Sequence, residues 1–183
     1  MHAVGAALDE LDVPSMIIGG IAVIAAGVPR DTIDIDATVL GRAADLDVVI
    51  EVFGRHGVIP RVPDARQFAR ERQVLLLVHE PSGVTIEVSF AWLPFEEEAL
   101  SRAREIDVEG LSVRVARPED LIVYKAAAWR DRDRTDIERL LTLYGGVIDV
   151  ERVRGLIRDI GSALDDPHRI DEFDAMLARA RGA

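Results

Sequence analysis

Short hydrophobic runs, separated by polar residues and glycines, fill roughly the first 115 positions of the chain. Apolar runs of about 4 to 8 residues, alternating or continuous, predict β-strands. We expect Ile33, Ile35 and Ala37 to face the core, and we expect the unbroken run Val74–His79 to be buried on both faces. Pro81–Gly83 and Glu109–Gly110 are turn residues between successive runs, and they predict hairpins over 74–90 and 106–115. The predicted strands are Ser15–Ile18, Ile33–Leu40, Val74–His79, Val84–Phe90, Ile106–Val108 and Leu111–Val115.

Hydrophobic residues at helical spacing interrupt these strands and then dominate the rest of the chain. A helix is predicted over Ala3–Leu11, and another at Leu46, Val49, Ile50 and Phe53. From about residue 117 every segment has helical spacing, beginning with Pro118 in a first-turn position. The later helices are predicted over 119–129, around Ile137–Tyr144, and over Val150–Ile160 and Ile170–Arg179. We therefore predict an α+β fold: a small mixed β-sheet core flanked by helices over 1–115, followed by a C-terminal helical module over 116–183.

Composition narrows the classes of protein that this pattern allows. The 183 residues are 49% hydrophobic, which is typical of a globular protein, and they carry a formal net charge of −11. That charge repels phosphate on average, so we expect no non-specific DNA binding and no membrane binding. The absence of cysteine excludes disulfides, thiolate zinc sites and cysteine nucleophiles. The longest apolar run, Met16–Val28, is shorter than the roughly 20 residues of a spanning helix, so a cytoplasmic protein is expected.

An Asp-x-Asp pair inside an apolar strand is the first candidate for chemistry. Asp34 and Asp36 lie two residues apart, so their side chains project from the same face of the strand. Two neighbouring carboxylates repel each other, and a divalent cation such as Mg²⁺ or Mn²⁺ relieves that repulsion. Glu87, on a neighbouring predicted strand, is the candidate for a third carboxylate. The alternative for all three residues is a solvated strand face.

Glycines and basic residues supply the candidate contacts to phosphate. Gly19–Gly20 follows a strand and precedes an apolar helical run, where backbone N–H groups can approach an anion, although an ordinary turn has the same pattern. Lys125 is the only lysine among 22 basic residues, and its compact charge in an apolar helix suggests a phosphate contact. The alternating charges of Arg130–Arg134, like the arginines of segment 54–73, fit either a binding surface or a solvated loop.

Three motifs follow one another along the chain. They are Gly19-Gly20-x-Ala22, then Arg30-x-Thr32-x-Asp34-Ile35-Asp36, and then Lys125 followed by Arg130-x-Arg132-Asp133-x-x-Asp136-Ile137. In this order they resemble the AbiEii-type nucleotidyltransferases of the polymerase-β-like superfamily. The resemblance covers most of the chain. The sequence differs from many superfamily members in having Gly-Gly where they have Gly-Ser, and Glu87 where they often have Asp.

The resemblance implies roles for individual residues. Asp34 and Asp36 match the metal-binding pair, with Glu87 as third carboxylate and general base. Lys125 matches a lysine that contacts the triphosphate. The remaining residues are implied to bind the nucleotide or to flank its pocket: Gly19, Gly20, Arg30, Thr32, Asp133 and Asp136.

The resemblance also implies an activity. A Mg²⁺-dependent enzyme would move an NMP from an NTP to an acceptor hydroxyl on a tRNA, a protein or a small molecule. The implied setting is a toxin-antitoxin or phage-defence system, with a cognate antitoxin-like protein as partner. Two alternatives remain: a non-catalytic nucleotide- or partner-binding protein on the same scaffold, and a metal-dependent phosphodiester hydrolase. The second would need histidines near the carboxylates, and His2, His56, His79 and His168 do not cluster there in sequence.

Overall fold

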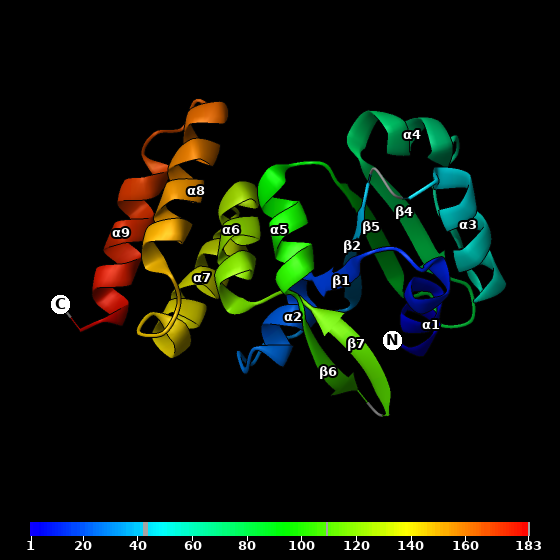
Figure 1. The fold of residues 1–183 in the computed structure, drawn as a ribbon, viewed down its shortest axis with the longest axis horizontal. Helices are drawn as coiled ribbons and strands as arrows, with labels where there is room; N and C mark the ends of the chain where they lie inside the picture. Colours follow the sequence, from blue (N-terminus) through cyan, green and yellow to red (C-terminus); the bar gives the residue numbers. More distant parts are fainter. Residues whose placement is uncertain (42–43, 109, 183) are drawn as a thin grey trace. The chain divides into compact units, whose positions relative to one another are not determined.

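The computed structural model describes residues 1–41, 44–108 and 110–182, and within these ranges it contains seven strands and nine helices (Figure 1). The expected α+β fold class is confirmed. The chain divides into two compact units, one of residues 1–22 and 31–116 and the other of residues 23–30 and 117–183. The predicted domain division after residue 115 stays a prediction. In the structure, the segment 23–30 is grouped with the second unit.

The first unit is built on one mixed sheet with the strand order β3-β4-β5-β2-β1-β7-β6. Strand β2 pairs in parallel with β5, and β1 pairs in parallel with β7, whereas the other neighbours are antiparallel. The strands are β1 (Ser15–Ile18), β2 (Asp34–Leu40), β3 (Val58–Pro60), β4 (Val74–His79), β5 (Thr85–Ala91), β6 (Arg104–Val108) and β7 (Leu111–Val115). Both predicted hairpins, β4–β5 and β6–β7, are confirmed.

The register gives the sheet one apolar face. Residues directly opposite each other on paired strands project from the same face. Ala37 of β2 pairs with Ile17 and Val88, and Ile35 pairs with Ile86. All five side chains are buried. The intervening positions of β2 and β5 carry the polar residues of the other face, namely Asp34, Asp36, Thr38, Thr85, Glu87 and Ser89.

Two expectations about burial are wrong. Ile33 is 87% exposed because β2 begins only at Asp34, so this residue lies before the strand and not in its apolar face. Val74–His79 is not buried on both faces. Leu75 and Leu77 are buried, but the positions between them are only half-buried. An unbroken apolar run therefore does not distinguish a doubly covered strand from one whose second face is partly open.

The helices of the first unit are α1 (His2–Leu11), α3 (Leu46–Arg55), α4 (Ala65–Arg72) and α5 (Pro94–Arg102), together with the start of α2 (Gly19–Ala25). Local signals explain two of the starts. The Asp45 carboxylate accepts hydrogen bonds from the N–H groups of Asp47 and Val48, which caps α3. Pro94 opens α5, and the Glu96 carboxylate accepts from the N–H groups of Trp92 and Leu93.

The sequence pattern did not reveal β3, α4 or α5. The sequence pattern of segment 54–73 fits a solvated loop or a binding surface, whereas the structure shows that the segment contains both β3 and α4. Helix α4 has only two buried residues, Ala65 and Ala69, so the apolar periodicity that marks a helix is nearly absent from it.

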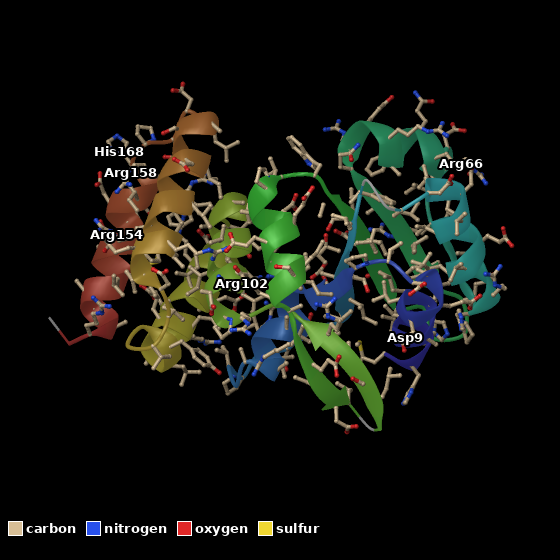
Figure 2. The ribbon with its side chains drawn as sticks, viewed as in Figure 1. Asp9, Arg66, Arg102, Arg154, Arg158 and His168 are labelled. Atoms are coloured by element: carbon tan, nitrogen blue, oxygen red, sulfur yellow. The ribbon has the colours of Figure 1, made fainter. Side chains whose placement is uncertain are left out.

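The second unit contains four helices: α6 (Pro118–Ala128), α7 (Asp131–Tyr144), α8 (Val150–Ala163) and α9 (Arg169–Ala180). Its core includes Leu121, Ile137 and Phe173, each with no exposed area. The segment 23–30 is held to α7 by the Tyr144 hydroxyl, which donates to the Ala26 carbonyl oxygen over 2.7 Å. Arg154, labelled on α8 in Figure 2, donates two 2.8 Å hydrogen bonds to Asp174 of α9.

Among the helices that the structure describes, none combines the length and the apolar character that crossing a membrane requires.

Candidate functional site

The paired aspartates lie on the polar face of β2, as the alternation of the sequence predicted. Asp36 is directly opposite Glu87 of β5 on one side and Ile18 of β1 on the other. Leu76 of β4 is opposite Glu87 in turn. These residues therefore form a row across four strands, with the carboxylates of Asp36 and Glu87 on adjacent strands that are about 5 Å apart. The structure thus brings Asp34, Asp36 and Glu87 to one face of one sheet.

Gly19 makes room for the Asp36 carboxylate. A Cβ atom built at residue 19 would lie 1.8 Å from Oδ2 of Asp36, and the backbone of Gly19 has a φ of +62°. Both the close approach and the left-handed backbone require glycine. Gly20 follows it in α2, whose first N–H groups have no partners within the helix. The predicted glycine turn and the predicted carboxylate pair are therefore adjacent in space.

Thr32 orients the other aspartate. Its hydroxyl donates a 2.6 Å hydrogen bond to Oδ1 of Asp34. The same hydroxyl lies 3.5 Å from the Asp34 carbonyl oxygen, a much weaker contact. Thr32 was expected to flank the pocket, and the structure gives it a direct contact with one of the two carboxylates.

Glu87 differs from the two aspartates in its exposure and its partner. Its side chain is 47% exposed, and its Oε1 accepts a 3.1 Å hydrogen bond from Nη2 of Arg61. Exposed ion pairs of this kind contribute about 0 to 1 kcal/mol, so the Glu87 carboxylate can exchange this partner at little cost. In the sequence, Arg61 is one of five arginines in segment 54–73, and no local pattern distinguishes it from the others. Its pairing with Glu87 follows from the position of residue 61 beside β4.

The donor set on this face fits a divalent cation held by two carboxylates. Mg²⁺ is usually bound in proteins by one or two carboxylates, with substrate phosphates and water filling its remaining positions. Asp34 and Asp36 supply such a pair. In the part of the chain that the structure describes, no group of three or more His, Cys, Asp and Glu side chains is arranged to hold a metal ion. The described residues therefore provide two carboxylate ligands for a cation, and substrate and water would have to supply the others.

Four other predicted residues meet inside the second unit. The Lys125 ammonium lies 3.0 Å from Oδ1 of Asp133 and 3.0 Å from Oδ2 of Asp136. Nη1 of Arg30 lies 2.7 Å from the same Asp136 oxygen. The four side chains are between 3% and 8% exposed, and their two positive and two negative charges balance. Residues separated by as many as 106 positions thus form one buried ionic cluster, which we call the Lys125 cluster.

The alternating run Arg130–Arg134 is the start of α7 and not a solvated loop. Asp133 is buried, and its Oδ2 accepts a hydrogen bond from the backbone N–H of Arg130 over 3.2 Å. Asp131 and Arg134, by contrast, form an exposed ion pair one turn apart. Helical geometry separates the run into one buried acid and several solvated charges.

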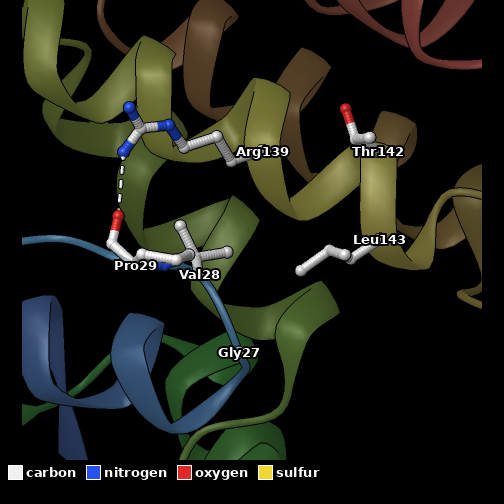
Figure 3. A pocket seen from close by; sticks show the side chains of 6 residues that line it. All are labelled: Gly27, Val28, Pro29, Arg139, Thr142 and Leu143. Carbon is white, nitrogen blue, oxygen red and sulfur yellow. Dashed lines mark hydrogen bonds between the residues drawn. The ribbon is translucent and has the colours of Figure 1, made fainter.

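A surface pocket of about 400 Å³ lies between the segment 23–30 and helix α7 of the second unit (Figure 3). Gly27, Val28 and Pro29 form one wall, and Arg139, Thr142 and Leu143 of α7 form the other. Nη1 of Arg139 donates to the Pro29 carbonyl oxygen over 3.1 Å, as Figure 3 shows. Among the described residues that line this pocket there is no carboxylate, so they offer none of the acidic ligands that Mg²⁺ prefers.

Comparison with known proteins assigns the chain to a family. A family model described as "Nucleotidyltransferase of unknown function (DUF6036)" matches residues 1–178. The chain belongs to this family of nucleotidyltransferases. The expectation of a nucleotidyltransferase is therefore confirmed, whereas the narrower resemblance to AbiEii-type enzymes stays a prediction. No protein with a curated function is similar enough in sequence to match the chain.

Solved structures show the same fold. The crystal structure of ANT(2″)-Ia in complex with adenylyl-2″-tobramycin is 19% identical, with a TM-score of 0.51, and the match covers 100% of this chain and 96% of that one. The solution structure of ANT(2″)-Ia, described as an antibiotic-resistance factor, is 18% identical, with a TM-score of 0.50 and coverage of 99% and 89%. At this level of identity the likeness concerns the fold alone.

Proposed function

We propose that this nucleotidyltransferase moves an NMP from an NTP to an acceptor hydroxyl, with Mg²⁺ or Mn²⁺ held by Asp34 and Asp36. The observation that carries the proposal is the row on the sheet, where Asp36 packs against Gly19 and lies in register with Glu87. The cation would neutralise phosphate charge and orient the triphosphate. Thr32 would keep the Asp34 carboxylate in place through its 2.6 Å hydrogen bond.

The proposed reaction is an in-line substitution at the α-phosphorus. The acceptor oxygen forms a bond to the α-phosphorus, the bond to the bridging oxygen of the β-phosphate breaks, and pyrophosphate leaves. Glu87 takes the proton of the acceptor hydroxyl, because its carboxylate is solvent-accessible and lies beside Asp36. It is also the third carboxylate that a second cation would use. The backbone N–H groups at Gly19–Gly20 are proposed to bind phosphate oxygens.

The assignment of Arg30, Lys125, Asp133 and Asp136 to nucleotide binding rests on the resemblance alone. The two carboxylates take two of the three N–H donors of the Lys125 ammonium. One donor is left for a phosphate oxygen. Loss of NTP binding in a Lys125 variant that is still fully folded would support the assignment.

Isotope labelling tests the reaction class. The protein is incubated with Mg²⁺, a panel of acceptors, and each NTP labelled either at the α- or at the γ-phosphate. We expect the α-label to become attached to an acceptor and the γ-label to appear in pyrophosphate. Transfer of the γ-label would indicate a kinase, and release of the α-label as free NMP would indicate a hydrolase. Binding of NTP without any turnover would favour the non-catalytic alternative.

The acceptor and the biological setting are proposed at a coarser level. The panel contains tRNA, total protein and an aminoglycoside, the last because ANT(2″)-Ia was solved with adenylyl-2″-tobramycin. A toxin-like role with an antitoxin-like partner rests on the AbiEii resemblance. That role predicts growth arrest on expression of the wild type and normal growth with Asp36→Asn. Arrest by both proteins would contradict it.

A further inference from the structure

An arginine-rich segment lies at the edge of the sheet next to Glu87. Residues 58–72 contain Arg61, Arg66, Arg70 and Arg72, against only Asp64 and Glu71. The segment forms edge strand β3 and helix α4, and Figure 2 labels Arg66 on that helix. The protein as a whole has a net charge of −11, so this segment is positively charged in a molecule whose net charge is negative.

The segment encloses a surface pocket of about 440 Å³, which we call the arginine pocket. Pro60, Val62 and Ala65 give it an apolar wall. Its polar lining consists of Arg66, Gln67 and Arg70, with Asp64 as the single acid. A pocket with two guanidinium groups and one amide is suited to an anion with several oxygens, because a guanidinium donates two parallel hydrogen bonds to phosphate or carboxylate.

Arg61 connects this pocket to the proposed reaction centre. It lies between the lining residues Pro60 and Val62, and its backbone N–H donates to the Leu76 carbonyl oxygen over 3.0 Å. Its guanidinium contacts Glu87, which lies opposite Asp36. The pocket thus lies beside β4, the strand that carries Leu76, the last residue of the row formed by Asp36, Glu87 and Leu76. Two strand spacings, about 10 Å, separate β2 from β4.

The guanidinium groups of the pocket are available to a ligand. Nε of Arg66 donates a hydrogen bond to Asp47 in an exposed ion pair. The two terminal nitrogens of the Arg66 guanidinium can therefore donate to a ligand. Among the described residues, Arg70 has no carboxylate within ion-pairing distance and its side chain makes no hydrogen bond. Arg66 and Arg70 both act on the neighbouring Asp47: a hydrogen bond from Arg66, followed by the charges of Arg66 and Arg70, holds the pKa of the Asp47 carboxyl below its ordinary value.

We propose that the arginine pocket binds a phosphate group of the acceptor while the acceptor hydroxyl lies at Glu87. The proposal rests on the proposed function and specifies its substrate class: a phosphate-bearing acceptor. A polycationic acceptor such as an aminoglycoside is disfavoured, because the charge of Arg70, which no carboxylate pairs among the described residues, repels it. The separation of about 10 Å or more also requires the phosphate and the reacting hydroxyl to belong to different parts of the acceptor, as in an oligonucleotide end.

Binding of a fluorescent single-stranded oligoribonucleotide tests the pocket directly, by anisotropy and without any turnover. Arg70→Glu is the informative variant, because it reverses a charge without breaking an ion pair. Arg158→Glu, at an exposed position of α8 (Figure 2), is the matched control. We expect Arg70→Glu to weaken binding about tenfold and to reduce the salt dependence by about one counterion, and Arg158→Glu to change neither by more than about twofold. Equal effects of both variants, or none, would overturn the proposal.

Two competitors identify the source of the phosphate. An oligodeoxyribonucleotide that displaces the probe at equal concentration shows that the phosphodiester chain is recognised. Displacement by ribose 5-phosphate at micromolar concentration shows instead that a small phosphorylated acceptor suffices. Both results support a phosphate site. Binding of tobramycin that Arg70→Glu strengthens, with no binding of either phosphate probe, would contradict it.

The experiment separates this proposal from the proposed function. Asp36→Asn is expected to abolish nucleotide transfer while leaving oligonucleotide affinity within about twofold of the wild type. If the wild type binds the probe through Arg70 but transfers nothing, the proposed function fails and the pocket stands. If it transfers NMP to an acceptor without phosphate, and Arg70→Glu leaves the KM of that acceptor unchanged, the pocket proposal fails and the function stands.

Discussion

The Asp36 carboxylate occupies the space that a side chain at residue 19 would need. The 1.8 Å approach to a Cβ atom built there is far inside van der Waals contact, so glycine at this position is a requirement of the site and not only of the turn. Gly83, in the turn between β4 and β5, provides a comparison. It also has a positive φ, +71°, but nothing lies within 4 Å of a Cβ built on it.

Gly19→Ala should therefore cost more than Gly83→Ala. We expect Gly83→Ala to lower the free energy of unfolding by about 1 kcal/mol through its backbone alone. Gly19→Ala adds the displacement of the Asp36 side chain, so we expect at least about 1 kcal/mol more, together with loss of nucleotide transfer. Denaturant titration and the transfer assay measure both effects. Equal stability and full activity in the two variants would show that Asp36 does not depend on Gly19.

Single residues were predictable from the sequence where a short-range rule applied. Asp34 and Asp36 share a face because side chains alternate along a strand, and this needs no tertiary information. The burial of Ile33 was predicted wrongly, because the same alternation does not show where the strand begins. The contact between Arg30 and Asp136 joins residues 106 positions apart, and no local pattern encodes it.

At the scale of elements, the Lys125 cluster ties α6, α7 and the segment 23–30 into one unit. Lys125→Met would remove the cation that contacts both Asp133 and Asp136, and it would leave Arg30 as the buried partner of Asp136 and the largely exposed Arg130 at 3.9 Å from Asp133. Removing one partner of a buried ion pair costs about 3 to 5 kcal/mol. We expect a loss of roughly 3 kcal/mol in the free energy of unfolding, measured by urea titration.

Arg132→Met, at an exposed position of α7, is the control for this substitution. We expect a change within about 0.5 kcal/mol. A Lys125→Met protein that is as stable as this control would mean that the cluster does not stabilise the unit. If that stable variant also failed to transfer NMP, the loss of activity would point to a direct role of Lys125 in nucleotide binding.

Helices α1 and α3 are joined by a surface cluster around Glu10. The carboxylate of Glu10 contacts Nε2 of His56 at 2.7 Å and Nη2 of Arg55 at 2.6 Å. The hydrogen bond with His56, and after it the bond with Arg55, holds the pKa of Glu10 below its ordinary value of 4.5. A depressed folded-state pKa contributes stability above pH 4.5 that is lost as the pH falls through the folded-state value.

Glu10→Gln should therefore be less stable than the wild type near neutral pH, and the difference should shrink in acid. Urea titrations of both proteins at about pH 7 and about pH 3 measure it. A difference that grows on acidification would contradict the assignment, because it would require the protonated carboxyl to be the favoured form in the folded protein.

The elements that were predicted have a strong apolar period, and two of those that were missed, β3 and α4, have none. The two hairpins and the four C-terminal helices follow from hydrophobic spacing and turn residues. Strand β3 has three residues, and α4 buries two alanines, so neither has enough apolar positions to show a period. The Arg61–Glu87 contact was missed for the same reason, since it depends on β3 lying beside β4.

At the scale of the whole molecule, the net charge of −11 does not exclude a phosphate-binding site, because the charge is unevenly distributed along the chain. Residues 149–174 hold eight acidic residues against four arginines, whereas 54–73 holds five arginines against two acids. The first segment belongs to the second unit and the second to the first unit. An average repulsion of nucleic acid is thus compatible with a local site for phosphate.

That the chain is a nucleotidyltransferase was predictable from the order of three motifs over most of the chain, whereas the grouping of residues into units was not. An apolar stretch such as 23–30 carries no sign of which partner it will pack against, and here it is grouped with the C-terminal helices. The polar face of the sheet was predictable in composition, but its register with β5, which sets Asp36 against Glu87, required the structure.

The most direct test of the central claim compares Asp36→Asn with Asp9→Asn in the transfer of α-labelled NMP with Mg²⁺. Asp36 lies on the β2 face, and Asp9 is an exposed aspartate of α1 (Figure 2), so the chemical change is the same in both variants. We expect Asp36→Asn to lose at least about a thousandfold in kcat and Asp9→Asn to match the wild type, with both proteins folded. Transfer by Asp36→Asn at the wild-type rate would contradict the account.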